Sequence, residues 1–139
     1  MNRLLMALAI LMMTVVSTLG LAGQASAAPT SGDPLSTGCA NGAQTIWQQQ
    51  VLGGGTIQVR YSPACGTNWV RISGATNRQS EAGIYSARTG WRYSPSYGRS
   101  PSTYWTPMVW APGSECVFFY AKIQPVNGAL YDTGQKKLC

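Results

Sequence analysis

The sequence contains no histidine and only four acidic residues among 139. The absence of histidine excludes Ser-His-Asp and Cys-His catalysis and the usual catalytic zinc sites. A glycosidase needs two carboxylates that face each other across a cleft, and the expected folded part offers Glu81, Glu115 and Asp132. We interpret these three as isolated surface acids. A Ser-Lys dyad would need Lys122, which strand alternation turns outward. The sequence therefore predicts a protein without enzymatic activity, metal or cofactor.

The N-terminal region has the pattern of a secretory signal peptide over residues 1–27. Arg3 precedes an apolar run over 4–21, and small residues follow at 25–27. The alternative is a membrane anchor, but polar residues interrupt the run and no basic stop-transfer cluster follows it. We therefore expect a secreted, extracellular protein without stable membrane insertion after signal cleavage. Residues 28–37 are small and polar with two prolines, which predicts a flexible leader before a single domain over 38–139.

The four cysteines are few but even in number, and none lies in a Cys-x-x-Cys spacing. In an oxidising compartment this pattern predicts two disulfides rather than a zinc site. Asn127-Gly128 between apolar runs is a strong hairpin signal. If these two residues form the loop, Cys116 and Cys139 face each other across the hairpin, and Cys39 pairs with Cys65 by elimination. A bulge in "DTGQKK" would shift this register and leave the other pairings open.

Short strand patterns recur along the chain between Gly, Pro, Ser and Asn residues, and no window shows a sustained helical period. The fold class predicted is all-β, a small antiparallel sandwich or barrel of about seven strands with two disulfides. Alternation predicts that Ile57, Val59 and Tyr61 share one face of a strand. In "VFFYAKI" it directs inward Val117, Phe119, Ala121 and Ile123. "GGG" at 53–55 predicts a turn, and Pro107 places "YWTPMVW" at a sheet edge.

Positive charge is concentrated between residues 60 and 99, where six arginines accompany a single acid, Glu81. Tryptophan and tyrosine occur in the same block, and arginine both stacks on aromatic rings and binds phosphate through its planar fork. The candidate binding residues are Arg60, Trp69, Arg71, Arg88, Trp91, Arg92, Tyr93 and Arg99. The alternative interpretation is structural: the tryptophans pack in the core or its rim, and the arginines form a solvated face.

The stretch "IQVRYSPACGTNWVRI" at 57–72, preceded by "TGC" at 37–39, resembles the signature of the YjfA family of small Gram-positive domains. "TPMVWAPGSECVFFYA" is similar to the end of that family's domain. The matching positions are Cys39, Arg60, Tyr61, Ser62, Pro63, Cys65, Trp69 and Arg71. The resemblance implies an extracytoplasmic β domain with a Cys39–Cys65 bridge. It brings no catalytic residues, because the family has no assigned function.

The basic aromatic block favours a binding module of the bacterial envelope or its surroundings. Its expected partner is an anionic wall polymer, a glycan or an extracellular nucleic acid, held by arginine forks and stacked rings. The alternative is a small secreted inhibitor or toxin that acts on an extracellular protein through the loop over 94–107. Three prolines stiffen that loop, and we expect it to display Tyr97, Arg99 and Tyr104.

Overall fold

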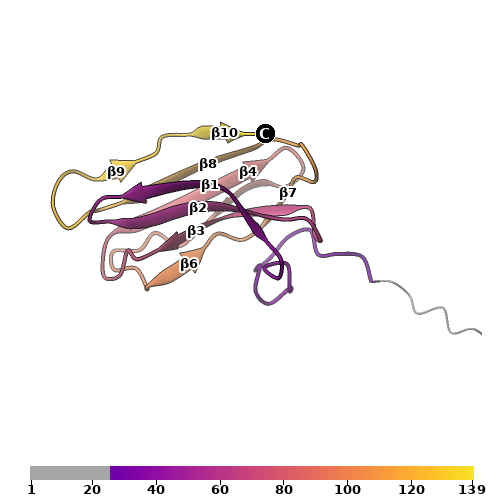
Figure 1. Cartoon of the computed structure of the whole chain (residues 1–139), viewed down its shortest axis with the longest axis horizontal. Coiled ribbons are helices and arrows are strands. Elements are labelled where there is room, and N and C mark those ends of the chain that lie inside the picture. The colour runs from indigo at the N-terminus through magenta and orange to yellow at the C-terminus, as the bar shows by residue number, and fades with distance from the viewer. Residues whose placement is uncertain (1–25) are drawn as a thin grey trace, which may run out of the picture.

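All regular structure in residues 26–139, which the computed structural model describes, is β-strand (Figure 1). No helix in this part could cross a membrane. The predicted signal peptide falls almost wholly outside the described residues. The strands are β1 (Gln44–Val51), β2 (Gly55–Ser62), β3 (Thr67–Ser73), β4 (Ser80–Ser86), β5 (Gly90–Tyr93), β6 (Thr103–Trp105), β7 (Val109–Trp110), β8 (Val117–Ile123), β9 (Tyr131–Asp132) and β10 (Lys136–Leu138).

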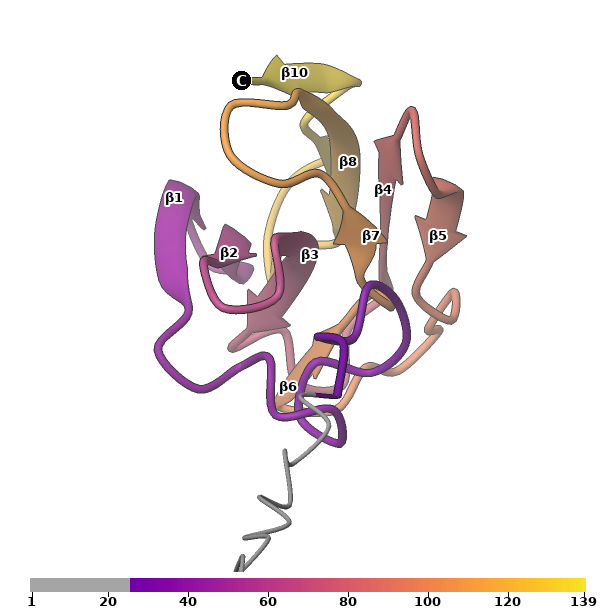
Figure 2. The same ribbon diagram turned by 90° about the vertical axis from the view of Figure 1, so that its right-hand side faces the viewer.

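The strands form two five-stranded antiparallel sheets that pack as a sandwich, so the predicted fold class is confirmed (Figure 2). The first sheet has the order β1-β2-β3-β6, with β7 also paired to β3. The second has the order β10-β8-β4-β5, with β9 also paired to β8. The strands number ten instead of about seven, in part because the segment over 103–110 and the C-terminal segment over 131–138 each form two short strands. Pro107 separates β6 from β7, and both lie at the edge beyond β3, as predicted.

The core lies between the sheets and is built by alternating residues of their strands. Ile57 and Val59 of β2 are fully buried, while Tyr61 is half-buried. The predicted inward face of β8 is confirmed, because each of its four members is at most 1% exposed: Val117, Phe119, Ala121 and Ile123. Trp47 of β1 packs on Phe119 with ring centroids 4.8 Å apart and closes one side of the core. The predicted turn over 53–55 joins β1 to β2.

Both predicted disulfides are present, but the hairpin that carries one of them is built differently. The expected two-residue loop at Asn127-Gly128 is wrong, since residues 124–130 connect β8 to β9. Lys122 then pairs with Asp132, whereas Phe119 pairs with Lys136. Between these two pairs, β8 spans three residue steps, whereas the segment from β9 to β10 spans four. Gly134, with a φ of 61°, lies in this bulge between β9 and β10, where a left-handed glycine is common.

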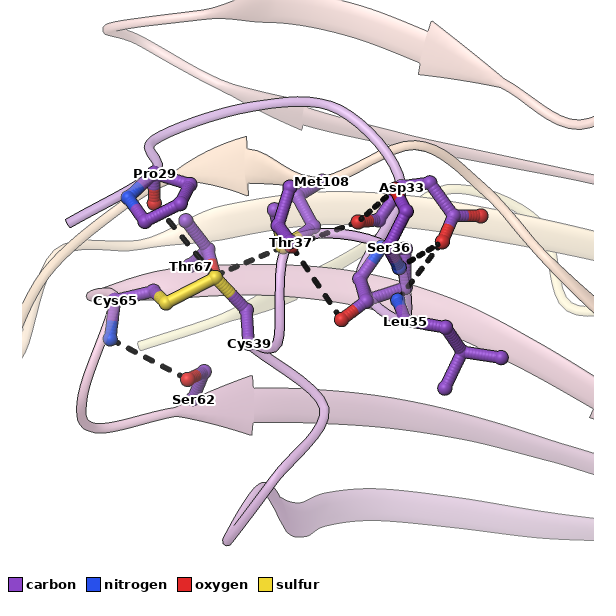
Figure 3. Close-up of a disulfide and its surroundings, with 11 residues drawn as sticks. Pro29, Asp33, Leu35, Ser36, Thr37, Cys39, Ser62, Cys65, Thr67 and Met108 are labelled. Carbon is purple, nitrogen blue, oxygen red and sulfur yellow. Dashed lines mark hydrogen bonds between the residues drawn. A yellow bond between two sulfur atoms is a disulfide. The ribbon is translucent and has the colours of Figure 1, made fainter.

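The segment before Cys39 folds onto the first sheet, which differs from the flexible leader expected over 28–37. Gly32 forms a β-bridge with Met108, and the Asp33 carboxylate accepts hydrogen bonds from the backbone N–H groups of Leu35 and Ser36 (Figure 3). The Cys39–Cys65 bridge follows directly and lies against Met108 in a small buried cluster. This cluster covers one end of the outer face of the first sheet.

The edge strands of the two sheets are irregular, short or charged. Edge strand β1 is irregular between Thr45 and Trp47 and carries several exposed glutamines. At the opposite edge β6 has three residues, and in the second sheet edge strand β5 has four. Edge strand β10 exposes Lys136 and Lys137 and is followed directly by the bridged Cys139.

Candidate functional site

Two of the candidate arginines meet on the outer face of the first sheet. Strand pairing places Arg60 of β2 opposite Trp69 of β3, and Arg71 of β3 opposite Trp105 of β6. Alternation turns all four side chains to the same side, away from the core. They surround a hollow of about 280 Å³ together with the segment that precedes β1. Its lining residues are Pro34, Leu35, Ala40, Arg60, Trp69, Arg71, Thr103 and Trp105.

The Arg60 guanidinium is fixed at the border of this hollow. Its Nη1 donates to the Thr45 hydroxyl at 2.5 Å, and its Nη2 donates to the Ala43 carbonyl at 2.8 Å. Partial burial, together with the positive charge of Arg71, lowers the pKa of Arg60 below its ordinary value. Within residues 26–139 neither arginine forms an ion pair, since the ion pairs there join Arg88 to Glu115 and Lys122 to Glu81. The hollow therefore contains two arginines that have no ion-pair partner, with the Asp33 carboxylate at its border on the Trp105 side.

The two tryptophans are held rigidly beside these arginines. Trp69 is only 3% exposed and packs in the cluster with Met108 and the Cys39–Cys65 bridge. The Trp105 indole donates to Asp33 Oδ2 at 2.7 Å. Burial opposes ionisation of Asp33, but hydrogen bonds from the Ser36 backbone, the Trp105 indole and other donors outweigh it and lower its pKa. These donors engage both carboxylate oxygens, and within residues 26–139 Asp33 forms no ion pair with Arg60 or Arg71.

The other predicted binding residues lie elsewhere. Arg88 Nε contacts the Glu115 carboxylate at 2.7 and 2.9 Å and its guanidinium lies 4.5 Å from the centre of the Trp110 ring, so its charge is compensated. Arg92 donates to the backbone carbonyl of Trp91, and Arg99 is exposed in the loop before β6. Trp91 and Tyr93 alternate with Arg92 and lie on the outer face of the second sheet, away from the hollow.

A family described as "Protein of unknown function (DUF2690)" matches residues 27–118. The chain belongs to this family. Its matched region contains the whole lining of the hollow and all eight candidate binding residues. No curated protein and no solved structure matches the chain. Membership in DUF2690 therefore establishes an uncharacterised family, and the narrower resemblance to the YjfA family stays a prediction.

Several lining residues of this DUF2690 protein were not among those predicted from its sequence. Pro34 and Leu35 belong to the segment expected as a leader, and Trp105 lies within the loop assigned to the inhibitor alternative. The sequence around Trp105 predicts only that it lies in an edge strand, and it does not indicate a binding role. Its position beside Arg71 depends on the pairing of β3 with β6, which joins segments far apart in the sequence.

The loop over 94–107 does not display all the residues that we expected it to present. Tyr104 is 5% exposed, and its hydroxyl donates to the Ser80 hydroxyl at 2.6 Å. Tyr97 packs edge-on against Tyr104, with ring centroids 4.7 Å apart. The prediction of a displayed Tyr104 is therefore wrong, because strand β6 directs this side chain into the core. Of the three residues, Arg99 is exposed and Tyr97 is half-buried.

Proposed function

We propose that this protein is an extracellular binding module that captures carboxylate- or phosphate-bearing polymers through Arg60 and Arg71. The observation that carries the proposal is the pair of arginines without an ion-pair partner beside a tryptophan-walled hollow. Arginine forks bind such anions in a bidentate manner, and hydrogen bonds to charged groups contribute about 1.5–3 kcal/mol each. The partly exposed Trp105 ring supplies an apolar surface for the carbon skeleton next to the anion.

The presence of two disulfides supports an oxidising environment, which agrees with the proposed location outside the cell. An anionic wall polymer is the partner that we favour there. The hollow of about 280 Å³ lies just below the range of about 300–1,000 Å³ that is typical of small-ligand sites. It would therefore hold one repeating unit of a polymer, and affinity for a long chain would come from repeated encounters with equivalent units.

We propose a binding role without catalysis. Glu115 is bound by Arg88, and Glu81 lies 3.3 Å from Lys122. Interaction with Arg88 lowers the pKa of Glu115, which is opposite to the raised pKa that a general acid needs. Glu81 and Glu115 thus have the surroundings of structural ion pairs.

The test is co-sedimentation of the purified protein with Gram-positive cell walls, with and without their teichoic acid, across a salt series. We expect binding that requires teichoic acid and falls with salt, with a log-log slope of about −1.5 to −2 for two neutralised phosphates. The variant Arg71→Gln should bind about 10- to 100-fold more weakly.

Arg99→Gln is the matched control, because it removes the same charge from an exposed loop outside the hollow. It should bind walls like the parent protein. Equal losses in both variants would mean that overall charge, and not the hollow, drives binding. A loss confined to Arg99→Gln, with capture of one stoichiometric protein instead of polymer, would favour the inhibitor alternative.

A further inference from the structure

We infer that the outer face of the second sheet is a separate binding site for a neutral polysaccharide chain. Alternation places a continuous group of rings on this face, supplied by β4, β5 and β8. Its members are Tyr85, Trp91, Tyr93, Phe118 and Tyr120. We call this group the aromatic platform. It lies on the opposite sheet from the hollow at Arg60 and Arg71 and shares no residue with that hollow.

The rings of the aromatic platform support one another. Trp91 and Tyr93 are nearly parallel, at 7°, with centroids 5.7 Å apart. Trp91 also lies 5.6 Å from Tyr85 and 6.0 Å from Tyr120. Neighbouring aromatic pairs at such distances are mutually stabilising. The platform is therefore arranged before any ligand arrives, which reduces the entropy lost on binding.

Gly83 creates the space in which two of these rings lie. A Cβ atom at position 83 would stand 2.5 Å from Tyr120 Cε1 and 2.9 Å from Tyr93 Cδ1. Such distances are well inside van der Waals contact, so any larger residue would displace the rings. Glycine in the middle of a strand is otherwise unfavourable. Here it allows Tyr93 and Tyr120 to approach the sheet closely.

The platform borders two adjoining hollows that share Gln135. The first, of about 340 Å³, is lined by Tyr85, Trp91, Phe118 and Gln135. The second, of about 220 Å³, is lined by Tyr120, Lys122, Asp132, Gly134 and Gln135. The bulge at Gly134 brings Gln135 to this position, and bulges often redirect side chains beside functional sites. Two neighbouring hollows suit a chain of repeating rings better than a single compact molecule.

Polar groups at the second hollow match the hydroxyl groups of a sugar. Lys122 supplies an ammonium donor, Asp132 a carboxylate acceptor and Gln135 an amide that both donates and accepts. The electron-rich faces of aromatic rings attract the polarised C–H groups on the flat side of a sugar ring. The platform therefore offers stacking and hydrogen bonding side by side.

Charge balance favours a neutral ligand over a polyanion at this site. Lys122 is paired with Glu81 at 3.3 Å and also lies near Asp132. Lys137, 5.9 Å from the centre of the Phe118 ring, is the second lysine on this face, so Lys122 and Lys137 are balanced by Glu81 and Asp132. The outward positions of β4, β5 and β8 carry aromatic rings, charged groups and Gly83, with no aliphatic side chain between the flat faces on which sugar rings stack. A neutral polysaccharide fits both observations.

The test is isothermal titration of the purified protein with cellohexaose and chitohexaose, two neutral oligosaccharides, at low and high salt. We expect saturable binding to at least one of them, with an affinity that salt leaves unchanged. Trp91→Ala should weaken this binding about tenfold or more, and Trp91→Phe should restore part of it. Gly83→Ala keeps every ring but displaces two of them, so it should also weaken binding.

Circular dichroism and thermal melting show whether each variant is folded, and Gln135→Ala provides an exposed substitution with little risk to folding. Arg71→Gln on the first sheet should bind these oligosaccharides like the parent protein. The inference is overturned if neither oligosaccharide binds at millimolar concentration. It is also overturned if binding is lost in Arg71→Gln or at high salt, or survives intact in folded Trp91→Ala.

Discussion

Replacement of Cys39 and Cys65 by alanine should destabilise the protein more than the same replacement of Cys116 and Cys139. The two bridges span 26 and 23 residues. In the chain-entropy model, loops of these lengths give nearly the same contribution, about 3.5 kcal/mol for each bridge. Any difference between the two double variants must therefore come from contacts in the folded state.

The folded-state contacts of the two bridges are unequal. Cys39 and Cys65 are 1% and 8% exposed and pack against Trp69 and Met108. Loss of their buried sulfur atoms leaves space in this cluster and should cost roughly 1–2 kcal/mol more. Cys139, by contrast, is exposed at the C-terminus. Removal of the first bridge should lower the free energy of unfolding by about 5 kcal/mol, and removal of the second by about 3.5 kcal/mol. A typical domain has a free energy of unfolding of about 5–15 kcal/mol.

Urea unfolding of both double variants, followed by tryptophan fluorescence, measures these free energies by linear extrapolation. The slope must be compared as well, because an altered denatured state would change it. Equal destabilisation would refute the reasoning, since the cluster around Trp69 would then add nothing to the constraint on the unfolded chain. The reverse order would show that the C-terminal bridge has the larger structural role.

Three further changes test other parts of the structure. Burial raises the pKa of Tyr104 to about 12, so between pH 10 and 12 the folded state keeps a proton that the unfolded state loses. The melting temperature should therefore fall as the pH rises from about 10 to 12. Tyr104→Phe should make the melting temperature less dependent on pH in this range. The lowered pKa of Asp33 means that its contribution to stability is fully present above the ordinary carboxyl pKa and is lost as the pH falls through the folded pKa. Asp33→Asn should therefore reduce the fall in melting temperature at acid pH. Phe119→Ala removes a fully buried ring that contacts Trp47, and urea unfolding should show a loss of about 3–5 kcal/mol.

The pairing of Cys116 with Cys139 was predictable even though the loop used to predict it was wrong. The connection between β8 and β9 is longer than two residues and shifts the register by one position. With that register alone, Cys139 would face Glu115. The extra residue at Gly134 restores the offset, so that Leu138 pairs with Val117 and the cysteines meet. The alternation of apolar residues predicts which face of a strand is buried. It does not predict the longer loop or the bulge at Gly134, whose effects on the register cancel.

The basic block could be found in the sequence but its division between two surfaces could not. Residues 74–79 carry the chain from the first sheet to the second, so Arg71 and Arg92 lie on different sheets. The partner that compensates Arg88 lies 27 residues away, at Glu115. Local patterns give the side of a strand on which a residue lies, whereas these relationships depend on how the sheets are assembled.

The features of the sheet edges bear on how the protein behaves at high concentration. An exposed strand can add a strand from another molecule, which leads to aggregation. The irregularity near Thr45 disturbs β1, the shortness of β5 and β6 leaves few free backbone groups, and Lys136 and Lys137 place like charges along β10. Each edge thus discourages intermolecular strand addition by a different means. Ligands are therefore expected to bind the broad faces of the sandwich, while its edges keep neighbouring copies apart.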